Sequence, residues 1–127
     1  MVVYIREAHP EEGWILPENR RSGVAVHEPT TDLERAAVAQ LCATKLELTM
    51  PTVIDHVDNA VASAYGGWPD RLYLIDTDGR IAYQGGEGPF GFKPDELGAA
   101  IEGFLAAAGA ARAAAPAANA QSGGRTG

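Results

Sequence analysis

The sequence is poorest in cysteine, because Cys42 is the only one among 127 residues. A single cysteine cannot form a disulfide within the chain, a Cys-x-x-Cys redox pair or a cysteine-based zinc site. The three histidines, His9, His27 and His56, also lack the close pairing, such as His-x-x-x-His, that is typical of metal ligands. The sequence therefore predicts no resident metal or cofactor.

Clusters of basic residues are missing as well. The chain carries 10 Lys and Arg against 17 Asp and Glu, which gives a net charge of −7. An acidic chain without a basic patch is not typical of proteins that bind nucleic acids or anionic membranes. No apolar run approaches the roughly 20 residues that span a bilayer, and no signal-peptide pattern is present. We therefore expect a cytoplasmic protein with neither nucleic-acid nor membrane partners.

Large side chains are scarce near the C-terminus. Residues 109–127 are almost entirely Ala, Gly, Pro, Ser, Asn and Arg, a composition that is typical of a disordered tail. Gly109 is expected to end the last helix. Residues 1–108 are then expected to form one folded domain, and residues 109–127 an Ala/Gly-rich tail.

Short β-like and helical segments alternate along the rest of the chain. Apolar, β-branched runs predict strands at residues 2–5, 52–54, 72–76 and 80–84. Apolar periodicity and capping residues predict helices at residues 31–46, 60–65 and 94–108, and residues 6–30 are predicted to form a long loop. The order of strand, loop and helix, strand, helix, hairpin, helix indicates an α/β fold.

The first predicted helix has a clear start. Thr31 and Glu34 form a capping-box pattern, in which each side chain bonds to the main-chain amide of the other residue. Its inner face is expected to consist of Leu33, Ala37, Val38 and Leu41. Cys42 lies late in this helix, away from the N-terminal amides that lower a thiol pKa, so we expect it to be inert.

Several motifs are spread over most of the chain. They are Tyr4-Ile5-x-Glu7-Ala8-His9-x-x-x-Gly13-Trp14, Leu33-Glu34-Arg35, Tyr65-Gly66-Gly67-Trp68-Pro69, residues 72–81 and residues 88–94. Together they resemble the iodothyronine deiodinase family and its bacterial relatives. The resemblance implies a thioredoxin-like sheet with flanking helices, and the activity of a thiol or selenol oxidoreductase.

In that family a cysteine or selenocysteine at the start of the first helix is the nucleophile. The sequence shows no counterpart of the strand and helix that carry it, so we expect a thioredoxin-like domain truncated at its N-terminus and inactive by itself. The resemblance implies that Glu7 and His9 serve proton transfer beside the nucleophile. The expected partners are a small iodinated aromatic or peroxide substrate and an external thiol reductant.

The resemblance also places Trp68 and Pro69 at the substrate groove, with a cis bond expected before Pro69. Simpler interpretations stay open, because His9 and Glu7 can be ordinary loop residues and Trp68 can simply pack. Two other functions remain as alternatives. The chain can be a non-catalytic binding module that takes a strand from a partner, or a reductase of the peroxiredoxin or cytochrome-maturation type.

Overall fold

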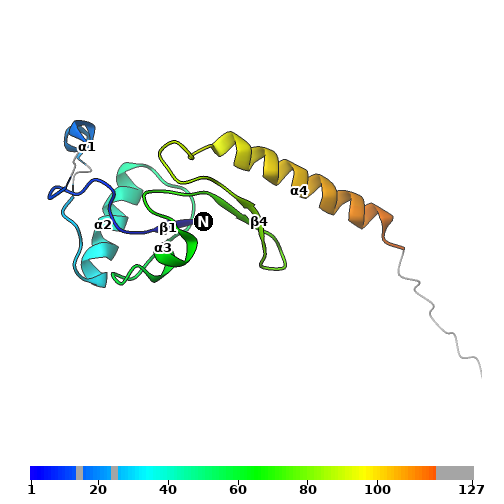
Figure 1. Cartoon of the computed structure of the whole chain (residues 1–127), viewed down its shortest axis with the longest axis horizontal. Helices are drawn as coiled ribbons and strands as arrows, with labels where there is room; N and C mark the ends of the chain where they lie inside the picture. Colours follow the sequence, from blue (N-terminus) through cyan, green and yellow to red (C-terminus); the bar gives the residue numbers. More distant parts are fainter. Residues whose placement is uncertain (14–15, 24–25, 117–127) are drawn as a thin grey trace, which may run out of the picture.

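The computed structural model describes residues 1–13, 16–23 and 26–116. Within these residues, four strands and four helices make a mixed α/β architecture, as predicted (Figure 1). In chain order they are β1 (Val2–Tyr4), α1 (Pro17–Ser22), α2 (Asp32–Lys45), β2 (Thr52–Ile54), α3 (Ala60–Tyr65), β3 (Tyr73–Ile75), β4 (Ile81–Gln84) and α4 (Pro94–Ala114).

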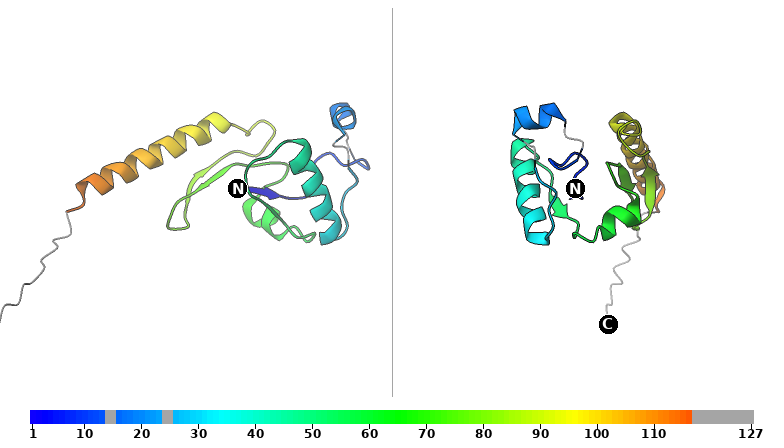
Figure 2. Two further views of the ribbon diagram at one scale, coloured as in Figure 1. Left: turned by 180° about the vertical axis from the view of Figure 1, so that it is seen from behind. Right: turned by 60° about the vertical axis from the view of Figure 1, so that its left-hand side comes forward.

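The four strands form two separate pairs in the described part of the chain. β1 pairs in parallel with β2, with Val2 opposite Thr52, and β3 pairs antiparallel with β4, with Tyr73 opposite Gln84. Figure 2 shows β1, β2 and α2 on one side of the molecule and the β3–β4 hairpin with α4 on the other. The parallel pair, the hairpin and the flanking helices are consistent with a thioredoxin-like α/β fold.

The segment predicted as one long loop contains a helix. α1 has Pro17 in its first turn and is followed by Gly23, whose φ of 72° lies in the left-handed region. Glu18 in the first turn and Arg20 and Arg21 in the last turn suit the helix dipole. The prediction of an unbroken loop was wrong because six residues are too short to show an apolar period.

Helix α2 starts as predicted but presents a different face to the core. The capping box between Thr31 and Glu34 is present. Leu33, however, is 82% exposed, whereas Arg35 and Ala39 are 1% and 3% exposed. The predicted inner face was therefore wrong. The helix is turned so that the Arg35 guanidinium reaches main-chain carbonyl groups beyond β2.

The first turn of helix α3 is capped by a residue just after β2. Asn59 is the residue before the helix, but its side chain makes no capping hydrogen bond. Instead the buried carboxylate of Asp55 accepts hydrogen bonds from the amides of Val61 (3.1 Å) and Ala62 (2.8 Å). Asp55 thus joins the end of β2 to the first turn of α3.

Helix α4 continues past Gly109 to Ala114, so the predicted end at Gly109 was wrong. Alanine is the best helix former, and the Ala-rich stretch extends the helix. By length and by a mean hydropathy of 1.2, α4 could cross a membrane, contrary to the expectation that no run approaches that length. However, α4 also contacts β3 and β4. Its length and composition are therefore not enough to place it in a membrane. The boundary between residues 1–108 and 109–127 stays a prediction, and residues 117–127 lie outside the described part.

Candidate functional site

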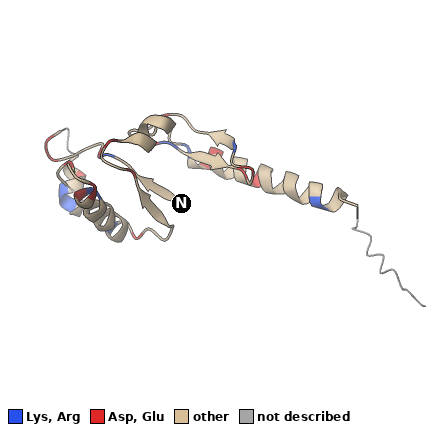
Figure 3. Ribbon diagram, turned by 90° about the horizontal axis from the view of Figure 1, so that it is seen from below, with Lys and Arg blue, Asp and Glu red and all other residues tan. Residues whose placement is uncertain are grey.

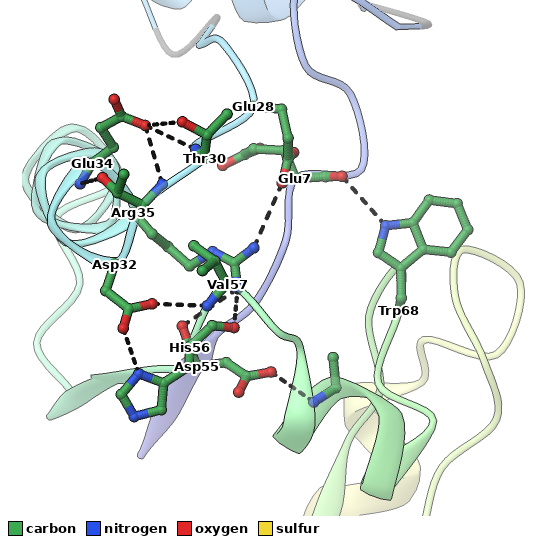
Figure 4. Close-up of polar contacts among 12 residues, drawn as sticks. Glu7, Glu28, Thr30, Asp32, Glu34, Arg35, Asp55, His56, Val57 and Trp68 are labelled. Carbon is green, nitrogen blue, oxygen red and sulfur yellow. Dashed lines mark hydrogen bonds and ion pairs between the residues drawn. The ribbon is translucent and has the colours of Figure 1, made fainter.

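An open cavity of about 540 Å³ lies where the loop after β1 meets the start of α2 and the loop before β3. Its wall carries charged, polar and aromatic side chains, namely Arg6, Glu7, Glu28, Arg35, Asn59 and Trp68. These residues come from segments far apart in the sequence, and Figure 4 shows Glu7, Glu28, Arg35 and Trp68 gathered in one region. The predicted site residues Glu7 and Trp68 thus line the same cavity.

Arg35 is the most deeply buried group of this wall. Its Nη1 atom donates hydrogen bonds to the main-chain oxygens of His56 (2.6 Å) and Asp55 (3.4 Å). Its Nη2 atom lies 3.6 Å from Oε1 of Glu28 (Figure 4). A buried arginine is tolerated when carbonyl and carboxylate oxygens surround its donors, as here.

Sequence reasoning assigned no role to Arg35, although the Leu33-Glu34-Arg35 motif contains it. A signal was available in the helix period. Arg35, Ala39 and Cys42 are spaced i, i+4 and i+7, and the two small residues leave room for a long side chain on that face. Arg35 lies on the buried face together with Ala39.

Glu7 lines the same cavity as this arginine. Burial raises the pKa of the Glu7 carboxyl group and the negative charge of Glu28 raises it further, while the charges of Arg35 and His9 oppose this change. The main-chain oxygen of Glu7 accepts a hydrogen bond from Nε1 of Trp68 at 3.3 Å. Glu7 is therefore a carboxyl group that can hold a proton at higher pH than an exposed glutamate.

His9 lies two residues beyond Glu7 and is half-buried. The charge of His9 lowers the pKa of the Glu7 carboxyl group, against the larger effect of burial. Ala8 and Pro10, its neighbours in sequence, line the cavity. The catalytic role of the pair stays a prediction.

Trp68 and Pro69 follow α3. The Trp68–Pro69 peptide bond is cis, as predicted. The Trp68 ring is 41% exposed, and the Arg6 guanidinium carbon lies 4.9 Å from its centroid, which is a cation–π contact. Trp68 lines the cavity, while Pro69 is half-buried beside it, and their role as a substrate groove stays a prediction. Trp14, which belongs to the first motif, lies outside the described residues.

Cys42 is a half-buried thiol on α2. Burial raises its pKa, and the charge of Glu7 raises it further, so little of the reactive thiolate is present near neutral pH. The structure thus supports the interpretation of Cys42 as inert.

The other two histidines bind carboxylates at the surface. His27 pairs with Glu12, and Nδ1 of His56 lies 2.8 Å from Oδ2 of Asp32. No group of three or more His, Cys, Asp or Glu side chains is placed to hold a metal ion within the described residues. The cavity wall thus combines the aromatic ring of Trp68 with the titratable carboxyl group of Glu7.

Comparison with known proteins agrees with the motifs. The family model of iodothyronine deiodinase matches residues 1–104. Over 97 residues the chain is 40% identical to thyroxine 5-deiodinase of Gallus gallus, an alignment that covers 76% of this chain and 36% of the relative. It is 38% identical to the enzyme of Ovis aries over 105 residues, covering 82% of this chain and 34% of the relative.

The chain spans about a third of the length of these curated relatives. The matched region contains β1 to β4 and the first half of α4, together with every residue of the cavity wall. This chain belongs to the iodothyronine deiodinase family.

Proposed function

We propose that this chain carries the proton-transfer and substrate-binding part of a deiodinase-like thiol or selenol oxidoreductase. The observation that supports this most directly is the Glu7 carboxyl group with its raised pKa, beside His9 and on the wall of a cavity that Trp68 borders. The substrate class is a small iodinated aromatic molecule, as the names of the relatives indicate for those proteins.

The proposed reaction has two steps. A thiolate or selenolate attacks the iodine atom, so a chalcogen–iodine bond forms and the carbon–iodine bond breaks. The electron pair left on the ring carbon takes a proton from His9. The Glu7 carboxyl group then gives a proton back to the imidazole. Two molecules of an external thiol then reduce the chalcogen–iodine bond, which releases iodide and yields a disulfide.

Cys42 is not the nucleophile in this proposal, because its pKa is raised and it lies on the buried side of α2. The reactive cysteine or selenocysteine is instead not one of residues 1–127. We therefore expect the 127-residue chain to release no iodide from thyroxine with dithiothreitol alone.

The test supplies the nucleophile as a soluble selenol. With thyroxine and dithiothreitol, the chain should accelerate iodide release above the rate of the selenol alone. His9→Ala should remove most of that acceleration, and Cys42→Ser should leave it unchanged. Turnover without added selenol that disappears in Cys42→Ser would contradict the proposal.

Binding is measured separately. In a Trp14→Phe background Trp68 is the only tryptophan of the chain. Because Trp68 lines the cavity, an iodinated aromatic ligand should quench its fluorescence through the heavy-atom effect. A matched ligand without iodine serves as the control. Equal reduction of a hydroperoxide in parallel assays would favour the peroxide-reductase alternative.

A binding module is the second candidate, and one observation favours it. β1–β2 and β3–β4 are separate two-stranded sheets in the described part of the chain, so each pair has outer edges on which an extended segment of a partner can add. A module of this kind would bind peptide strands and not iodinated aromatics. The fluorescence titration distinguishes the two functions.

A further inference from the structure

The two arginines of the cavity wall are bound in opposite ways. Arg35 is 1% exposed, and its guanidinium is taken up by Glu28 and by main-chain oxygens. Arg6 is exposed on the same cavity and forms no ion pair or side-chain hydrogen bond with any residue that the structure describes. A guanidinium stays charged at every physiological pH. The N–H donors of Arg6 can therefore bind an acceptor that a ligand brings into the cavity.

The Arg6 guanidinium is nevertheless placed by an aromatic ring. Its carbon Cζ lies 4.9 Å from the centroid of the Trp68 ring, and Trp68 lines the cavity as well. The ring is itself tied down, because its Nε1 atom donates a hydrogen bond of 3.3 Å to the main-chain oxygen of Glu7, the residue next to Arg6 (Figure 4). A cation–π contact uses no N–H donor of the guanidinium. It therefore orients Arg6 and leaves the donors available.

The rest of the wall carries little negative charge that could compete with a ligand for Arg6. Oε1 of Glu28 lies 3.6 Å from Nη2 of Arg35, and burial raises the pKa of the Glu7 carboxyl group. The whole chain has a net charge of −7 and tends to repel anions, so an anionic ligand needs a local cation. Apolar surface for a ring comes from Ala8, Pro10, Pro29 and Val57.

We propose that Arg6 is a specificity-determining residue that binds a carboxylate of the ligand, while the aromatic ring of the ligand lies beside Trp68. The planar fork of an arginine matches the two oxygens of a carboxylate, with two parallel N–H···O hydrogen bonds. The substrate class is then an iodinated aromatic acid and not a neutral iodinated arene. This assignment rests on the proposed function, which it makes more specific. Arg6 binds the ligand and takes no part in proton transfer.

The experiment compares two probes of nearly equal shape, meta-iodobenzoate and meta-iodobenzamide, by quenching of Trp68 fluorescence in the Trp14→Phe chain near neutral pH. The benzoate should bind about tenfold more tightly, which corresponds to about 1.4 kcal/mol. Arg6→Met should abolish this preference. Arg6→Lys keeps the charge but loses the fork, so it should retain only part of the preference. Added salt should weaken the preference, because Arg6 is exposed.

Arg20→Met is the matched control. It removes the same charge from an exposed pair with Glu11 outside the cavity wall, and should leave the preference unchanged. Substituting Arg6 alters the surroundings of Trp68, so affinities are taken from the concentration dependence of the quenching and not from its amplitude.

The possible failures are distinguishable. Equal affinity of the unsubstituted Arg6 chain for the two probes, or a preference that survives in Arg6→Met, overturns the role of Arg6 and leaves the proposed function standing. A preference that depends on Arg6, without accelerated iodide release in the selenol assay, supports the carboxylate site and contradicts the proposed function alone. Absence of quenching by either probe contradicts both.

Discussion

The part of the molecule from β1 to α3 and the part from β3 to α4 are held together in different ways. In the first part the most buried side chains include Arg35 and Asp55, whose polar atoms bind main-chain groups of neighbouring segments. In the second part α4 lies against the β3–β4 hairpin, and none of its residues is fully buried. Figure 3 shows the same contrast, with charged residues gathered around α1 and α2 and few along α4.

The difference explains where the cavity lies. Only three hydrophobic residues are buried in the described part of the chain, namely Val26, Ala39 and Ala62, and all belong to the first part. With so little apolar burial, hydrogen bonds to main-chain carbonyls and amides must fix the loops around the cavity. The second part supplies an apolar surface with many exposed side chains and no comparable polar network.

The largest expected effect is on the arginine of the first part. Arg35→Met leaves the carbonyl groups of Asp55 and His56 and the carboxylate of Glu28 without their donor. We expect a loss of about 3 kcal/mol in the free energy of unfolding, measured by urea denaturation. Arg20→Met, which removes an exposed ion pair, should change it by less than about 0.5 kcal/mol. Equal effects of the two substitutions would mean that the buried contacts of Arg35 stabilise the fold no more than an exposed ion pair does.

The next effect concerns the cap of α3. Asp55→Ala leaves the amides of Val61 and Ala62 without an acceptor, so the free energy of unfolding should fall by about 2 kcal/mol. Asp55→Asn keeps an acceptor oxygen and should cost less. Asp58→Ala, which removes only the bond to the Ala60 amide on the exposed side, is the comparison. A smaller loss for Asp55 than for Asp58 would show that burial adds nothing here.

A third test addresses the apolar part. Phe104 is the half-buried aromatic residue of α4, whereas its neighbour Leu105 is 63% exposed. Phe104→Ala should lower the free energy of unfolding by about 1–2 kcal/mol, less than for a fully buried phenylalanine. Leu105→Ala should change it by less than about 0.5 kcal/mol. Similar losses at both positions would mean that the apolar face of α4 is covered in solution.

The smallest effect depends on pH. The hydrogen bond with Asp32 raises the pKa of His56 above its ordinary value of 6.5. The bond from the Val57 amide, followed by that with His56, lowers the pKa of Asp32 below its ordinary 3.8. For a histidine with a raised pKa, the stabilisation is complete below pH 6.5 and is lost as the pH rises through the folded-state pKa. For the aspartate it is lost as the pH falls through its lowered pKa.

His56→Asn should therefore lower the thermal midpoint more at pH 5.5 than at pH 8.5, within the window that these two directions define. The same substitution in an Asp32→Asn background should show a smaller difference, because only the weaker effects of Asp58 and Asp55 on the His56 pKa are left. A pH-independent effect of His56→Asn would assign its role to packing alone.

Much of the fold followed from local sequence patterns. The capping box at Thr31, the turn between β3 and β4 and the short apolar runs predicted elements that are present, because caps, turns and strand runs depend on neighbours in the chain. The cis bond before Pro69 was also predicted correctly. The six-residue helix α1 and the extension of α4 to Ala114 were missed, since neither shows an amphipathic period.

The site was predicted only in part. Glu7, His9, Trp68 and Pro69 came from the motifs, and the structure places Glu7 and Trp68 on one cavity wall. Arg35 had no assigned role because its burial depends on carbonyl groups about 20 residues away. Helical periodicity favoured Leu33 for the inner face, and distant partners decided otherwise.

The sequence by itself determined the succession of strands and helices, the helix starts and the family, because each depends on residues adjacent in the chain or on motifs within it. The tertiary structure alone decided which face of α2 is buried and which side chains surround Glu7. Those choices depend on where the loops before α2 and after β2 place their oxygen atoms, and a buried guanidinium lies wherever these acceptors meet.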